Sequence, residues 1–173
     1  MRCKTVRKSL SLEIIEKWLK DSDCDVRQAA MNACNGRDVP LEIIEVGLKD
    51  SDWRVRQAAM NACNGRDDLI KRTIDPPEKV YKKCWNDVIV VAHIPDDAMV
   101  RGLVGNKCRA SKAEIIDILG DFGGEKIGIS LYDGQTCYYI GDTIEIDDFD
   151  MSFKECSTGF HFFCSKEEAN DYN

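Results

Sequence analysis

Apolar residues recur at helical spacing through the first third of the chain. Leu41, Ile44 and Leu48 are three and four residues apart, as on one face of a helix. A second stripe with the same spacing follows, and it is mostly alanine. It consists of Val55, Ala58, Ala59 and Ala62. The two stripes predict a pair of helices that pack closely together.

Capping residues mark the ends of these two expected helices. Pro40 precedes the first, and proline is favoured in a first helical turn. Ser51 or Asp52 can cap the start of the second helix, and Gly65 can close its end. The unit is therefore expected to be a helix–turn–helix pair.

The same unit occurs twice in the sequence. Residues 12–38 and 41–67 align with an offset of 29 residues and differ at only four positions, which are Lys17/Val46, Trp18/Gly47, Cys24/Trp53 and Asp25/Arg54. Such closeness indicates tandem duplication of one structural unit. One unit cannot bury its own stripe, so units are expected to stack. A third, partial copy is expected in "DDLIKRTID", before Pro76 and Pro77.

The second half of the chain has a different pattern. Three short apolar runs are typical of strands: "NDVIVVAHI", "AMVRGLV" and "GFHFFC". The stretch "KIGISLYDGQTCYYIGDTIEID" predicts a hairpin that turns at Asp133 and Gly134. Residues 107–119 fit either a strand or a helix. Ser165 and Glu168 have the spacing of a capping box and predict a C-terminal helix.

The predicted fold class combines these two halves. Residues 1–75 are expected to form a short α-solenoid of about two and a half 29-residue helical pairs. Residues 79–173 are expected to form a small mixed α+β domain.

Two family resemblances add to this interpretation. The segments "DSDWRVRQAAMNA" and "PLEIIEVGLKDSDWRVR" resemble the leucine-rich repeat variant and related HEAT-like helical repeats, over about residues 9–75. The segments "VYKKC", "IVVAHIPDDA", "KCRASKAEIIDI", "GDTIEIDDFD" and "ECSTGFHFFCSKEEA" resemble the domain of unknown function at the C-terminus of bacterial and viral pentapeptide-repeat proteins. The first resemblance implies a binding scaffold, and the second implies an appended domain with no assigned activity.

Composition limits the partners and the compartment. Residues 1–75 carry 14 Lys and Arg against 13 Asp and Glu, whereas residues 76–173 carry 10 against 18. Nucleic acid is therefore not expected as a partner. The chain shows no secretory signal and no apolar run of membrane-spanning length, so a cytoplasmic protein without membrane contact is expected. The nine cysteines include no C-x-x-C pair, and we expect reduced thiols, with Cys34 and Cys63 buried, and no metal or cofactor.

The helical repeats supply the first set of candidate site residues. Polar side chains recur at equivalent positions of the two copies: Arg27 and Arg56, Gln28 and Gln57, Asn32 and Asn61. They can form a ridge that binds a protein partner, or they can be a solvated surface that pairs with nearby acids. The favoured function is a non-catalytic binding or adaptor protein that contacts a protein partner through its repeats.

The second half supplies candidates for an enzymatic alternative. His161, Arg109 and Cys156 are the candidate catalytic residues, since a nucleophilic thiol needs a nearby base. Lys107, Arg109 and Lys112 can bind a phosphate or a carboxylate, or pair with the acidic stretch at 142–150. The string "GFHFFCSKEEANDY" is loosely similar to a strand–helix segment of the poly-ADP-ribose polymerases. That similarity implies NAD binding or ADP-ribosyl transfer as the alternative function.

Overall fold

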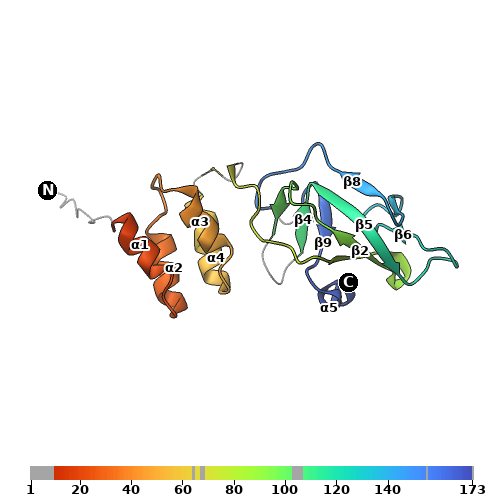
Figure 1. Cartoon of the computed structure of the whole chain (residues 1–173), viewed down its shortest axis with the longest axis horizontal. Helices are drawn as coiled ribbons and strands as arrows, with labels where there is room; N and C mark the ends of the chain where they lie inside the picture. Colours follow the sequence, from red (N-terminus) through yellow and green to blue (C-terminus); the bar gives the residue numbers. More distant parts are fainter. Residues whose placement is uncertain (1–9, 64, 67–68, 103–106, 155, 173) are drawn as a thin grey trace. The chain divides into compact units, whose positions relative to one another are not determined.

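The computed structural model describes residues 10–63, 65–66, 69–102, 107–154 and 156–172. The chain divides into two compact units, residues 1–67 and 68–173, and Figure 1 shows the elements of each. Residues 1–9 of the predicted repeat segment, and 103–104 of the predicted strand "AMVRGLV", lie outside the described residues.

The first unit contains both predicted helical pairs. Its helices are α1 (Leu12–Trp18), α2 (Cys24–Asn32), α3 (Leu41–Leu48) and α4 (Trp53–Ala62). Asp52 is the residue that caps α4, because its carboxylate accepts a hydrogen bond from the Arg54 amide at 2.8 Å. Gly65 follows α4 with a φ of +76°, a left-handed conformation that favours glycine.

The alanine stripe lets the helices of this unit approach closely. α4 packs against both α2 and α3, and Cys34 and Cys63 are buried as predicted. Gly47 lies at the closest approach, where an added Cβ would be 2.2 Å from Met31 Sδ and 2.8 Å from Ala59 Cβ. The first copy has Trp18 at this position, so the two copies differ where α3 meets the preceding helix.

The predicted third copy is wrong. Residues 70–75 form no helix but run beside a strand of the second unit. Arg72 makes a parallel bridge to Val100, and the Thr73 amide donates to the Val100 carbonyl at 3.1 Å. The Thr73 hydroxyl also donates to the Gly102 carbonyl at 2.8 Å. This segment therefore belongs to the sheet unit.

The second unit is built mainly from antiparallel strands. One sheet has the order β1-β2-β5-β8, a second has the order β3-β4-β9, and β6 pairs with β7. The strands of the first sheet are β1 (Val80–Lys83), β2 (Ile89–His93), β5 (Lys112–Leu119) and β8 (Thr143–Glu145). The others are β3 (Val100–Arg101), β4 (Cys108–Ala110), β9 (Phe160–Phe162), β6 (Gly128–Ile129) and β7 (Cys137–Tyr138). The predicted hairpin is confirmed as β6–β7.

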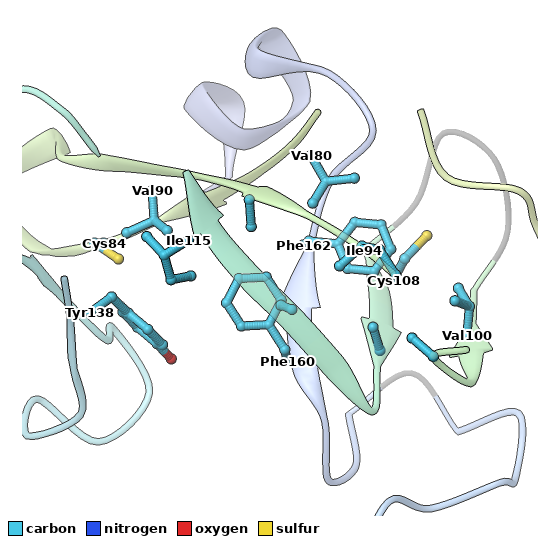
Figure 2. Close-up of a cluster of buried hydrophobic side chains, with 14 of the residues drawn as sticks. Val80, Cys84, Val90, Ile94, Val100, Cys108, Ile115, Tyr138, Phe160 and Phe162 are labelled. Atoms are coloured by element: carbon cyan, nitrogen blue, oxygen red, sulfur yellow. The ribbon is translucent and has the colours of Figure 1, made fainter. Parts of the chain in front are cut away.

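Apolar side chains from both sheets form one core, shown in Figure 2. The sheets also meet at an edge, where Tyr81 and Phe163 exchange two backbone hydrogen bonds of 2.9 and 2.7 Å. After β9 the chain enters the short helix α5 (Lys166–Asp171), which begins with the predicted Ser165–Glu168 capping box.

The predicted fold class, an α-solenoid followed by a mixed α+β domain, is wrong. The five α-helices of the described residues have only six to ten residues each. Four of them form the first unit and do not continue as a stacked array, because the third copy is absent. The second unit is mainly antiparallel sheet with one short α-helix among its described residues. No helix in the described part of the chain is long and apolar enough to cross a bilayer.

Candidate functional site

Arg27, a predicted ridge residue, is used to join the two repeats. Its Nε and Nη2 atoms donate to the two carboxylate oxygens of Asp50 at 2.8 and 3.0 Å. Its Nη1 atom donates to the carbonyls of Asp21 and Ser22, both at 2.9 Å. Burial would raise the pKa of Asp50, but hydrogen bonds from Arg27 and from the Asp52 amide lower it below its ordinary value.

Arg56 repeats part of this arrangement one unit later. Its Nη1 atom donates to the carbonyls of Asp50 and Ser51, both at 2.8 Å, and its side chain is buried. Both arginines therefore satisfy carbonyls in the turn that precedes their own helix. They are occupied within the fold and do not offer a free cationic ridge.

Two of the divergent positions meet where α2 and α4 begin. Arg54 pairs with Asp25 at 2.9 Å and donates to Cys24 Sγ, also at 2.9 Å. α2 and α4 pack against each other and their N-terminal residues touch, so the two helices run in the same direction. Asp23, Cys24 and Asp25 present ligand atoms within 4.8 Å of one another. The guanidinium of Arg54 already supplies a cation to this group, so we assign it no metal.

The predicted amides lie in matching rows on these two parallel helices. Gln28 and Asn32 are four residues apart on α2, and Gln57 and Asn61 are their equivalents on α4. Gln28 is partly exposed and the other three are exposed. None of the four side chains has a hydrogen bond to any residue that the structure describes.

Trp53 extends the α4 row by one helical turn. It is four residues before Gln57 and is 64% exposed. The sequence interpretation noted Trp53 only as a difference between the copies and missed it as a candidate site residue. Its large apolar ring in a row of polar residues was the available signal. We define the amide face as Trp53, Gln28, Asn32, Gln57 and Asn61.

In the second unit, Arg109 holds the long loop between β8 and β9 in place. It is 1% exposed, and its Nη1 atom donates to the carbonyls of Asp150 and Thr158 at 2.9 and 2.8 Å. Its Nη2 atom donates to the Ser152 carbonyl at 2.7 Å. Burial lowers the pKa of Arg109. Its guanidinium is thus committed to main-chain acceptors.

The remaining candidates of the second unit do not converge on one point. Lys107 Nζ donates to Cys156 Sγ at 3.4 Å and to the Tyr172 hydroxyl at 3.3 Å. Lys112 pairs with Asp97 and Glu145 at 3.4 and 3.1 Å. His161 lies opposite Arg109 in the β4–β9 ladder.

Comparison with known proteins covers the second unit. Residues 70–169 match the model of a family of unknown function, DUF5758. The chain belongs to the DUF5758 family. Neither the curated proteins nor the solved structures contain a match to this chain.

The DUF5758 region contains two features that sequence reasoning did not single out. Arg101 is as buried as Arg109 and also holds the loop between β8 and β9, since its Nε atom donates to the Met151 carbonyl at 2.6 Å. A surface depression of about 530 Å³ lies beside the start of α5 and is lined by Pro77, Glu78, Lys79, Tyr81, Cys164, Ser165, Lys166 and Glu167. Both features depend on contacts between distant segments, which have no local sequence signal.

Proposed function

We propose that this protein is a non-catalytic binding protein that contacts a protein partner through the amide face of its first unit. The single observation that carries the proposal is that the amides of Gln28, Asn32, Gln57 and Asn61 make no hydrogen bond with any described residue and lie in two matching rows. Side chains that the fold does not use are the ones available to a partner.

The chemistry of this face suits a polypeptide. Each amide carries both hydrogen-bond donors and an acceptor, which can pair with the N–H and C=O groups of a peptide backbone. Trp53 supplies an exposed aromatic ring at one end, and tryptophan is enriched among the residues that dominate binding energy.

The same face is poorly suited to nucleic acid. Phosphate binding needs free cations, but the nearby arginines are engaged: Arg27 with Asp50, Arg54 with Asp25, and Arg56 with backbone carbonyls. A protein segment therefore remains the favoured partner class.

The NAD-handling alternative has less support. It needs basic side chains that are free to meet a phosphate, yet Arg109 donates to three carbonyls and Lys112 pairs with two acids. Ser165 and Glu168, within the segment that is loosely similar to the polymerases, are used to cap α5.

Selection of short random peptides on phage against the full chain tests the proposal. Enriched peptides should bind the Trp53→Ala variant about tenfold more weakly, equivalent to about 1.4 kcal/mol. The matched control is Glu13→Ala/Glu16→Ala, which changes exposed residues of α1 and should leave affinity unchanged. Unchanged affinity of Trp53→Ala, or selection of no peptide, would contradict the proposal.

A further inference from the structure

One lysine of the DUF5758 region lies on the core side of its strand. In the ladder between β1 and β2, Lys82 is directly opposite Val90, and Val80 is opposite Ala92. Side chains of directly opposite residues project from the same face of a sheet, and so do those of residues two apart on one strand. Val80, Val90 and Ala92 all belong to the buried core of Figure 2. Lys82 therefore projects from the face of β1 that carries the core.

Aromatic rings flank the amine of Lys82 where a carboxylate would be the usual neighbour. The Nζ atom lies 5.6 Å from the ring centroid of Tyr138 and 5.4 Å from that of Phe160, and the two rings pack edge to face. Among the described residues, its one hydrogen bond is long, 3.5 Å to the His161 carbonyl. No carboxylate in the described part of the chain forms an ion pair with Lys82.

These surroundings favour the neutral form of the amine. Burial removes the water that stabilises an ammonium group and so lowers the pKa of Lys82. The nearby cation of Lys107 acts in the same direction, whereas the Cys84 thiol and the Asp133 carboxylate oppose it. The Tyr138 hydroxyl brings no charge, because burial raises its pKa to about 12. The aromatic rings attract an ammonium group, but this attraction is weaker than the hydration that burial removes.

Lys82 is partly exposed, so a small solute can reach this side chain. We propose that Lys82 is a nucleophilic amine that forms a Schiff base with a small aldehyde or ketone. The neutral Nζ atom attacks the carbonyl carbon, and one N–H proton passes to the carbonyl oxygen to give a carbinolamine. The second N–H proton leaves with the hydroxyl group as water, and a C=N bond forms. Overall, one amine and one carbonyl compound give one imine and one water, and the addition of water reverses the reaction.

Reductive trapping in the full chain tests this assignment. The protein is incubated near neutral pH with limiting acetaldehyde and with sodium cyanoborohydride, which reduces an imine to a stable ethylamine. The protein is then digested at acidic residues, and fragment mass spectra give the labelling rate of each lysine. Lys79 is the internal reference, because it is exposed and forms no hydrogen bond or ion pair with the described residues. Lys82 should be labelled about tenfold faster than Lys79, and this ratio should fall as the pH rises and both amines become neutral.

Two matched variants assign the fast reaction to one side chain. In Lys82→Arg the fast uptake of label should disappear, because a guanidinium group stays protonated. In Lys79→Arg the fast uptake should be unchanged. If Lys82→Arg does not fold, the rates of Lys82 and Lys79 in the unmodified chain still decide the question. Labelling of Lys82 no faster than that of Lys79, or fast uptake that survives in a folded Lys82→Arg, would overturn the proposal.

Discussion

Arg27 and Asp50 form a bidentate salt bridge between the repeats, with N–O distances of 2.8 and 3.0 Å. Both side chains are largely buried, with 13% and 8% of their surfaces exposed. The same guanidinium also satisfies two carbonyls of its own repeat, so one side chain fixes the turn and the neighbouring unit together. The role of Arg27 is therefore structural: it stabilises the fold of the first unit.

Asp50→Asn should therefore weaken the first unit in a pH-dependent way. The native pKa of Asp50 is lowered, whereas an unfolded Asp titrates near about 3.9. Stability from this carboxylate is fully present above the unfolded value and is lost as the pH falls through the native pKa. Urea unfolding should give a lower free energy of unfolding for Asp50→Asn than for the unmodified protein near neutral pH. This difference should shrink in acid.

Asp21→Asn is the matched control for this prediction. Asp21 occupies the equivalent position of the first repeat and accepts a hydrogen bond from the Asp23 amide. Its carboxylate, unlike that of Asp50, has no arginine partner among the residues that the structure describes. Its substitution should cost much less, and an equal effect of both substitutions would count against the role given to Arg27.

Gly47→Ala should destabilise the first unit although alanine is the better helix former. The new methyl group would be 2.2 Å from Met31 Sδ, and overpacking of this kind costs about 1–3 kcal/mol. A double-mutant cycle with Met31→Ala, followed by urea unfolding, should show a favourable coupling because the shorter side chain makes room. If Gly47→Ala alone stabilised the protein, the helices at Gly47 would have to be less closely packed than the structure shows.

Arg109→Met should loosen the loop between β8 and β9. The substitution removes the donors to three carbonyls, and each buried acceptor left without a partner costs about 1–3 kcal/mol. Hydrogen exchange at the Asp150 and Ser152 amides should become faster, while exchange in β2 changes less. Equal acceleration in β2 would indicate global unfolding and not a local role for Arg109.

The amide face should behave in the opposite way. Gln57→Ala/Asn61→Ala removes side chains that make no hydrogen bond with the described residues, so thermal unfolding should change by less than about 0.5 kcal/mol. A large loss of stability would mean that these amides serve the fold and would weaken the case for a binding role.

Local signals were enough to predict several elements. The caps at Asp52 and Ser165 and the turn at Asp133–Gly134 each depend on neighbouring residues. The predicted third copy failed because Ile70 and Ile74 have helical spacing but bury their side chains beside a strand. The partner of this segment, Val100, lies far along the chain and leaves no trace in the local pattern.

The ambiguity of residues 107–119 also has a physical cause. In the ladder between β2 and β5, Val91 pairs with Asp117 but Ala92 pairs with Ile115. The extra residue, Ile116, shifts the alternation and places buried residues three apart, at Ile115 and Ile118. A β-bulge therefore imitates the spacing of a helix.

The candidate site was predictable only in part. The amides were visible because they recur in both copies at exposed helical positions. Arg27, Arg56 and Arg109 were not separable from binding residues, because their partners are mainly backbone carbonyls in turns and loops. Any sequence offers such carbonyls everywhere, and only the fold shows which ones a guanidinium reaches.

Photo-crosslinking from the amide face tests the proposed binding role most directly. A benzophenone side chain is placed at Gln57 in the full chain, and in a second protein at Glu16 on α1, and each is irradiated with a peptide selected on the unmodified protein. We predict crosslinking from position 57 and little from position 16. Equal crosslinking from both positions, or none from position 57 while the peptide still binds, would contradict the assignment of the amide face as the binding surface.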